Sequence, residues 1–346
     1  MEEITISQLT SSLIFMVSLS LGALSLSLAL TPVYTYLAYR HRLWKRQRDT
    51  STTGEALSVL NVLHADKIAR RFPTMAGIVI VLVVTVVTLL FNLDREQTWL
   101  PLAAPIGGGI VGLIDDVINI RGKQLGVAGL RTSIKFSMIT AVAAVLAWFF
   151  YTKLEFTTVQ IPFMSLPLEI GWLIVPLFIL AVVSAGNAVN ISDGLDGLAG
   201  GILASAFAAY AVIALLQGNV GIAAFCFTIL GTLITYLWFN VHPARFMMGD
   251  VGSFALGTSL GVVAMLTDAI FLLPIIGIVL VVEISSSAIQ IFSKKVFKRK
   301  VFISAPIHHH LEAIGWPESK VTMRFWLIAN VAGFVGLLVA LAGGHI

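Results

Sequence analysis

Long apolar stretches, separated by short polar segments, run through almost the whole chain. An α-helix needs about 20 predominantly apolar residues to cross a bilayer, whereas a transmembrane β-strand needs only about 10. The length of the stretches therefore predicts an all-α integral membrane protein with about ten transmembrane helices. These helices are expected at residues 11–38, 73–92, 98–114, 133–152, 170–189, 197–216, 220–239, 252–272, 274–293 and 322–342.

The composition agrees with this pattern. Hydrophobic residues make up 58% of the 346 residues and charged residues 12%, against about 25% charged residues in a typical soluble domain. The first apolar stretch is too long for a signal peptide and lacks a small-residue cleavage site, so we expect it to be the first span. No repeat or linker divides the chain, and we therefore predict one membrane domain over residues 1–346.

The basic residues set the expected orientation, because Lys and Arg gather in cytoplasmic loops. Of the 22 Lys and Arg residues, only Arg95 and Lys153 fall on the side opposite to all the others. The basic loops are therefore predicted to be cytoplasmic, and both termini to face outward. The basic cluster at residues 294–300 is explained by this topology and by attraction to anionic membrane lipid. Because no nucleic-acid-binding module is recognisable, we expect no nucleic-acid partner.

Acidic and histidine residues gather at the predicted cytoplasmic ends of the spans. Residues 187–201 combine aspartates, asparagines and glycines between two apolar stretches, and Asp115, Asp250 and residues 308–310 lie at the same face. Carboxylates beside a bilayer are costly and mark function, and glycines let backbone N–H groups approach a ligand closely. The pattern predicts a phosphoryl-transfer site at this face. A glycine-rich kink with polar caps is the structural alternative for residues 187–201.

The paired acids require a positive partner. Asp115 and Asp116 repel each other by a few kcal/mol at a typical effective dielectric constant, so a divalent cation, a shared proton or a nearby Lys or Arg must relieve the repulsion. A solvated helix end is the alternative. Asp250 is suited to metal binding, or to capping the next helix together with Ser253. Mg²⁺ commonly takes one or two carboxylates plus substrate phosphates.

The three consecutive histidines His308, His309 and His310 have several possible roles. Imidazole is a common zinc ligand, but three neighbouring side chains rarely point at one ion. The rings are equally suited to donating hydrogen bonds to phosphate oxygens. An incidental group of surface histidines is the structural alternative.

These segments carry a family resemblance. Residues 187–198, the Asp115–Asp116 pair and residues 249–253 resemble the polyprenyl-phosphate N-acetylhexosamine-1-phosphate transferase superfamily. Within it, residues 306–312, 315–316 and 324–326 are similar to the phospho-N-acetylmuramoyl-pentapeptide transferase family, and residues 73–77 match its Pro-Thr-Met-Gly-Gly turn with one change. The resemblance extends from about residue 70 to residue 326.

The resemblance implies a reaction and its partners. Undecaprenyl phosphate would attack the β-phosphate of UDP-N-acetylmuramoyl-pentapeptide, giving lipid I and UMP with Mg²⁺ as cofactor, in the bacterial cytoplasmic membrane. A direct attack and a two-step path through an aspartyl intermediate are both open. The oligomeric state is also open, with a homodimer as one alternative.

The resemblance also implies site residues. Asp115, Asp116 and Asp250 would be catalytic, with Asp250 holding the metal and Asp115 acting as base or as partner of the prenyl phosphate. The implied substrate-binding residues are Lys135, Asn187, Asn190, Asp193, Gly194, Leu195, Asp196, Asn240, Gln290, His308, His309 and His310.

The chain departs from the family pattern at two places, and two other functions are alternatives to this interpretation. Asn119 stands where the family usually has Lys, and the loop at residues 48–64 does not match, so that Lys67 or Arg70 would have to substitute for a phosphate-binding Lys. A sibling transferase that uses UDP-N-acetylglucosamine is the first alternative. A divalent-cation transporter is the second, although its acids should lie near the bilayer midplane rather than at one face.

Overall fold

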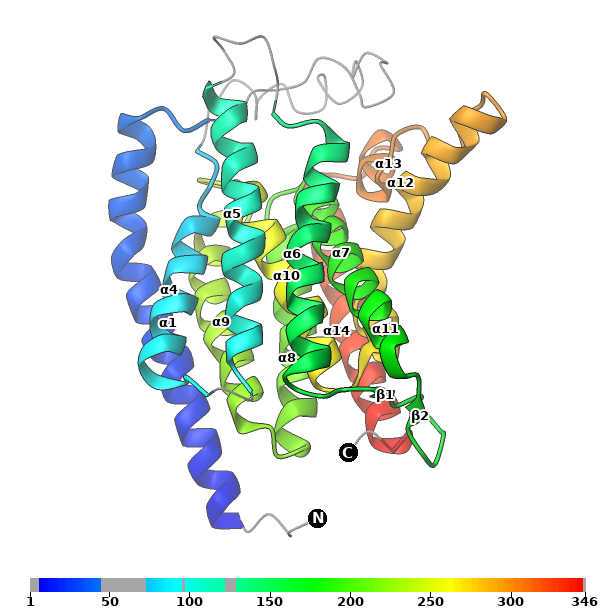
Figure 1. The fold of residues 1–346 in the computed structure, drawn as a ribbon. Coiled ribbons are helices and arrows are strands. Elements are labelled where there is room, and N and C mark those ends of the chain that lie inside the picture. The colour runs from blue at the N-terminus through cyan, green and yellow to red at the C-terminus, as the bar shows by residue number, and fades with distance from the viewer. Residues whose placement is uncertain (1–5, 45–72, 95–96, 122–128, 345–346) are drawn as a thin grey trace.

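The computed structural model describes residues 6–44, 73–94, 97–121 and 129–344, which form a bundle of helices with one short β-hairpin (Figure 1). The longer helices are α1 (Ile6–Arg40), α4 (Gly77–Phe91), α5 (Trp99–Arg121), α6 (Thr132–Thr152), α7 (Ile174–Ser192), α8 (Leu198–Leu216), α9 (Val220–Asn240), α10 (Gly249–Leu266), α12 (Ile278–Val296) and α14 (Glu318–Ala342). The short ones are α11 (Leu273–Ile276), α13 (Ile307–Ala313) and the 3₁₀ helices η2 (Gly171–Leu173) and η3 (Ile270–Leu272). Strands β1 (Thr158–Val159) and β2 (Leu168–Glu169) pair antiparallel.

Every predicted apolar stretch overlaps a helix, but two of them differ from a regular span. Within the described residues, eight helices are long and apolar enough to cross a membrane. Helix α4 has 15 residues, which is shorter than a regular span. The stretch predicted at 274–293 is broken, because the segments Ile270–Ile276 and Ile278–Val296 meet at an angle of 82° at Gly277. The chain is therefore a helical, multi-pass integral membrane protein, in which one predicted span is bent.

Helix α10 lies at the centre of the bundle, where it packs against α5 and α7 and is completely buried. Gly112 on α5 explains how closely α5 and α10 approach, because a Cβ at this position would collide with the backbone carbonyl of Asp250. The same approach brings the acidic end of α5 beside the first turn of α10.

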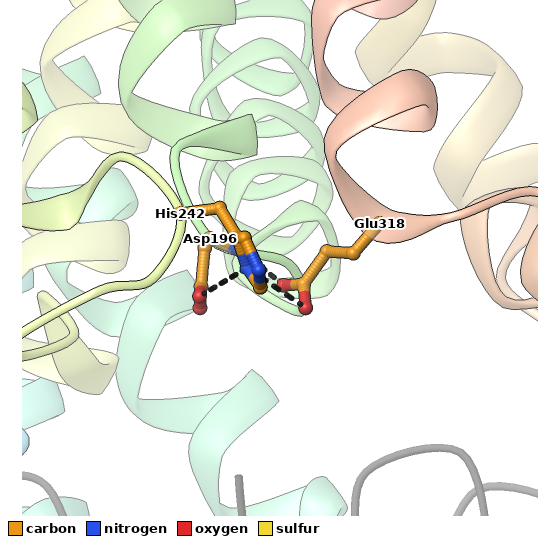
Figure 2. Close-up of side chains that lie close together, drawn as sticks. All are labelled: Asp196, His242 and Glu318. Atoms are coloured by element: carbon orange, nitrogen blue, oxygen red, sulfur yellow. Dashed lines mark hydrogen bonds and ion pairs between the residues drawn. The ribbon is translucent and has the colours of Figure 1, made fainter. Parts of the chain in front are cut away.

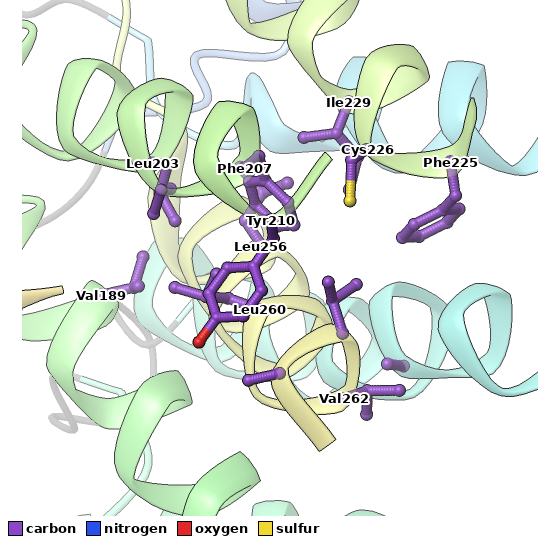
Figure 3. Close-up of a cluster of buried hydrophobic side chains, with 14 of the residues drawn as sticks. Val189, Leu203, Phe207, Tyr210, Phe225, Cys226, Ile229, Leu256, Leu260 and Val262 are labelled. Carbon is purple, nitrogen blue, oxygen red and sulfur yellow. The ribbon is translucent and has the colours of Figure 1, made fainter. Parts of the chain in front are cut away.

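Large apolar side chains fill the space between α8, α9 and α10 (Figure 3). Phe207 and Tyr210 come from α8, Phe225 and Cys226 from α9, and Leu260 from α10, and all five are fully buried. The buried Tyr210 hydroxyl donates a hydrogen bond to the Ala269 carbonyl at 3.1 Å. In a membrane, where lipid tails are as apolar as the core, such packing contacts hold helices together.

The helices at the rim are apolar and exposed. Only 22% of the most apolar window of α1 and 28% of that of α6 and of α14 is buried in the protein. Exposed apolar surface of this extent is rare in soluble proteins and fits contact with lipid. The start of α1 and the end of α14 lie at one end of the bundle, and α13 lies at the other (Figure 1).

Candidate active site

Lys135 links two of the predicted acids. Its Nζ lies 3.0 Å from Asp115 Oδ2 and 2.9 Å from Asp250 Oδ2. The Leu130 backbone N–H also donates to Asp115 Oδ1 at 2.6 Å. The Lys135 side chain is 15% exposed, and those of Asp115 and Asp250 are 2% and 5% exposed. Helices α5, α6 and α10 thus each contribute one charge to a buried ionic group, called here the Asp115–Lys135–Asp250 network.

Asp116 lies beside this network and contacts the start of α10. Its Oδ2 accepts a hydrogen bond from the Val251 N–H at 3.1 Å, and its side chain is fully buried. A carboxylate at this place satisfies one of the free N–H groups of the first helical turn and interacts favourably with the helix dipole. Gly249 has a φ of +73° and no side chain, and a Cβ there would lie 2.6 Å from Asp116 Oδ2.

The capping alternative for Asp250 does not agree with the geometry. Met248 is the N-cap of α10, without a side-chain capping bond, and Asp250 lies in the first turn. Ser253 donates to the Gly249 carbonyl at 3.0 Å and accepts from Asn190 Nδ2 at 2.9 Å. Asn190 therefore ties α7 to α10 directly beside the network.

Residues 73–77 pack against the segment that leads to Asp250. The Met247 N–H donates to the Pro73 carbonyl at 3.0 Å, and the Gly77 N–H donates to the Met248 carbonyl at 2.9 Å. Tyr34 of α1 anchors the same turn, because its hydroxyl donates to the Thr74 carbonyl at 2.5 Å. The turn that the sequence matched to the family thus supports the start of α10.

The predicted substrate residues between α7 and α8 have different surroundings. Asn187 donates to the Val183 carbonyl of its own helix at 2.8 Å. Asp193 is the C-cap of α7, and Leu195 is fully buried in the core. Gly194 lies against His308 of the triple-histidine motif, because a Cβ at Gly194 would be 2.5 Å from His308 Nε2.

Each histidine of the triple motif has its own partner. His308 Nδ1 lies 2.8 Å from Glu283 Oε2, and both side chains are completely buried. His309 Nδ1 lies 2.8 Å from Glu312 Oε2. His310 Nδ1 accepts the Ile303 N–H at 3.3 Å. Because the motif is helical, successive side chains point about 100° apart, so the three imidazoles do not converge on one ion. His308 reaches the loop between α7 and α8, where its Nε2 lies beside Gly194.

Asn240 and Gln290 hold loop backbone. Asn240 Oδ1 accepts the Gly197 N–H at 2.9 Å, and its Nδ2 donates to the Phe246 carbonyl at 2.7 Å. Gln290 Oε1 accepts the N–H groups of Val301 and Phe302, each at 3.0 Å. Their role in substrate binding stays a prediction.

Asp196 meets His242 and Glu318, two residues that no sequence pattern indicated (Figure 2). His242 Nδ1 lies 3.2 Å from Asp196 Oδ2 and 3.6 Å from Glu318 Oε2. One ligand atom from each residue lies within 4.8 Å of the others, so that this trio, called here the Asp196 cluster, could hold a metal ion.

The structure thus brings Asp115, Lys135 and Asp250 together directly, and Asp116 and Asn190 through α10. Asp196 meets His242 and Glu318, whereas His309, His310 and Gln290 contact Glu312, Ile303 and Phe302, respectively. The first-loop candidates Lys67 and Arg70, and residues 48–64, lie outside the described residues.

Comparison with known proteins decides the family. Residues 98–268 match the family model described as glycosyl transferase family 4. The chain is 39% identical over 340 residues to a phospho-N-acetylmuramoyl-pentapeptide-transferase of Chloroflexus aggregans, covering 94% of this chain and 89% of that protein. The chain belongs to the phospho-N-acetylmuramoyl-pentapeptide-transferase family. Transferases of the same name from a Geobacillus strain (42% over 280 residues; 79% of this chain, 83% of that protein) and Desulfotalea psychrophila (38% over 309 residues; 82% and 86%) are also similar.

Members of this family are phosphoglycosyl transferases, so the chain is an enzyme of the transferase class. The family match spans α5 to α10, and these helices carry all three residues of the Asp115–Lys135–Asp250 network. The resemblance seen in the sequence is therefore confirmed at the level of family.

Proposed function

We propose that this chain transfers phospho-N-acetylmuramoyl-pentapeptide from its UDP-linked precursor to undecaprenyl phosphate, giving lipid I and UMP. The observation that carries the proposal is the identity of 39% over 94% of the chain to a transferase of that name. The Asp115–Lys135–Asp250 network supports it, because phosphoryl transfer requires positioned charge more than covalent chemistry by the protein.

In the proposed reaction, a phosphate oxygen of undecaprenyl phosphate forms a bond to the β-phosphorus of the nucleotide. The bond between that phosphorus and the oxygen bridging to the α-phosphorus breaks, and the electron pair leaves with UMP. Lys135 would donate hydrogen bonds to phosphate oxygens, and Asp115 would take the proton of the attacking phosphate or orient it. Asp116 positions the first turn of α10 and, through it, Asp250.

The acids of this site fit Mg²⁺. Mg²⁺ prefers carboxylate oxygens and binds through one or two of them plus substrate phosphates. The ammonium of Lys135, within 3.0 Å of one carboxylate and 2.9 Å of another, is evidence that a cation is favoured there. Asp250 would hold the ion, which when bound would neutralise charge on the diphosphate.

The nucleotide and sugar are proposed to bind around the loop between α7 and α8. His308 contributes most directly, because its Nε2 faces Gly194 while Glu283 holds its Nδ1. Asn187, Asn190, Asp193, Leu195 and Asp196 would line the same side. The remaining proposed substrate residues are Lys135, Asn240, Gln290, His309 and His310.

The end of the bundle that carries α13 is proposed to face the cytoplasm of a bacterium, with both termini on the outer side of its inner membrane. The distribution of Lys and Arg supports this orientation, and the start of α1 and the end of α14 lie opposite to α13 (Figure 1). This placement lets the lipid phosphate arrive from the membrane and the nucleotide from the cytosol. Assembly into a homodimer stays a prediction.

The test is UMP release by the full-length protein in detergent, with undecaprenyl phosphate and Mg²⁺. UDP-N-acetylmuramoyl-pentapeptide and UDP-N-acetylglucosamine are supplied in parallel, and Asp250→Asn is the control. Turnover of the muramoyl nucleotide alone supports the proposal, whereas turnover of the glucosamine nucleotide identifies the sibling transferase. A stoichiometric burst of UMP without undecaprenyl phosphate would establish the two-step path.

A further inference from the structure

Three residues that are distant in the sequence meet at the Asp196 cluster (Figure 2). Asp196 lies in the loop between α7 and α8, His242 follows α9, and Glu318 is the first residue of α14. The side chains of Asp196 and Glu318 are 4% and 12% exposed, and that of His242 is 42% exposed. Two largely buried carboxylates therefore face one imidazole that is open to solvent on its other side.

The two distances from the imidazole fit a tetrahedral metal centre, and the ligand oxygens of Asp196 and Glu318 lie within 4.8 Å of each other. Zinc–nitrogen and zinc–oxygen bonds of about 2.0–2.2 Å place neighbouring ligand atoms of a tetrahedron roughly 3.3–3.6 Å apart. The distances from His242 Nδ1 to Asp196 Oδ2 and to Glu318 Oε2 are 3.2 Å and 3.6 Å. Three protein ligands leave a fourth position for water, as in metal sites that are not closed.

The ligands are held in place by contacts outside the trio. The Ala244 N–H donates to Asp196 Oδ2 at 3.0 Å, and Thr322 Oγ1 donates to the Asp196 carbonyl at 3.1 Å. The other oxygen of Glu318 accepts the Asp196 N–H at 2.6 Å. Supporting hydrogen bonds of this kind orient metal ligands and raise metal affinity.

We propose that Asp196, His242 and Glu318 form a second divalent-cation site, separate from the Mg²⁺ site assigned to Asp250, and that it takes a transition metal such as Zn²⁺ in preference to Mg²⁺. The preference follows from the imidazole nitrogen, which suits zinc, whereas Mg²⁺ favours oxygen ligands alone. An ion bound here ties the α7–α8 loop to α14 and to the segment that leads from His242 to Asp250.

The test measures metal binding directly on the chelator-treated full-length protein in detergent. Titration with Zn²⁺ in millimolar Mg²⁺ is followed by calorimetry, and Co²⁺ is added as a spectroscopic probe. We expect one ion that Mg²⁺ does not displace, visible absorption typical of tetrahedral Co²⁺, and a rise in Tm on adding Zn²⁺. His242→Gln and Glu318→Gln should each weaken Zn²⁺ binding at least 10-fold and abolish the rise in Tm.

Two control variants separate this site from other histidines. His41→Gln removes an exposed imidazole at the end of α1, and His310→Gln removes one from the triple motif; both should bind Zn²⁺ as the wild type does. Tm without metal shows whether each variant is folded. Zn²⁺ binding that persists in folded His242→Gln and Glu318→Gln, or that is lost in His310→Gln instead, would overturn the proposal. Because the readout is binding, a failure here leaves the proposed transferase function untouched.

Discussion

Replacing Lys135 with glutamine leaves Asp115 and Asp250 facing each other without the ammonium that lies 3.0 Å and 2.9 Å from them. Removing one partner of a buried ion pair costs about 3–5 kcal/mol. Because the Lys135 side chain is 15% exposed, water can solvate part of the remaining charge, and we expect the lower limit, about 3 kcal/mol. Glutamine keeps a similar length and a hydrogen-bond donor, so that the loss reports mainly on charge.

The same contacts should matter for turnover. If Lys135 stabilises the charge of the transferring phosphoryl group, a loss of about 3 kcal/mol in the transition state lowers kcat roughly 100-fold. The loss of a competing cation should also let Mg²⁺ bind more tightly, so the Mg²⁺ concentration for half-maximal rate should fall. UMP release at varied Mg²⁺ measures both quantities, and Tm measures folding.

Arg131→Gln is the matched control, because Arg131 is an exposed basic residue at the start of the same helix. It should leave kcat, Tm and the Mg²⁺ dependence close to those of the wild type. The reasoning is refuted if Lys135→Gln keeps a kcat within threefold of the wild type with an unchanged Tm. A purely structural role would lower Tm without altering the Mg²⁺ dependence of the folded fraction.

Four further variants test other parts of the account. Asp250→Asn should lose Mg²⁺-dependent UMP release while its Tm shows a folded protein, and near-normal turnover would exclude the metal role. Asp115→Asn should lower kcat at least 100-fold with nucleotide affinity nearly intact, and an equal fall in affinity would indicate a binding role. Gly112→Ala should lower the free energy of unfolding by about 1–3 kcal/mol through overpacking. Gly22→Ala is the control, because a Cβ at Gly22 meets open space, and it should not lower stability. Equal Tm values for the two variants would contradict the close approach of α5 and α10. In the turn after α10, burial raises the pKa of Asp268 to about 6. The stability that this raised pKa contributes is present below about pH 4 and is lost as pH rises through 6. Asp268→Asn should therefore flatten the dependence of Tm on pH between pH 4 and 7. Parallel Tm profiles of the variant and the wild type would contradict this.

The sequence predicted the helices well because hydropathy reports directly on burial in lipid. The length of an apolar stretch does not report on its path, however. The stretch at 274–293 reads as one span, yet Pro274 and Gly277 lie where the chain turns by 82°. The close approach of α5 to α10 was also not predicted, since the role of Gly112 depends on the atoms of another helix.

The same distinction between predictable and unpredictable features applies to the candidate site. The aspartates could be selected because a carboxylate at a membrane helix end is unusual in itself. The partners of those aspartates depend on the fold: Asp196 meets Glu318, 122 positions later, through the packing of α14 on α8. No local pattern marked His242 or Glu318. The triple histidine was conspicuous, but its helical geometry sends each ring to a different partner, which a consecutive motif does not reveal.

The most direct test of the central claim is a structure of the protein with UDP-N-acetylmuramoyl-pentapeptide and Mn²⁺, in which anomalous scattering locates the metal. We expect a Mn²⁺ peak at Asp250 in contact with the diphosphate, with Lys135 and Asp115 beside the β-phosphate. A diphosphate bound away from all three residues, with no metal at Asp250, would contradict it.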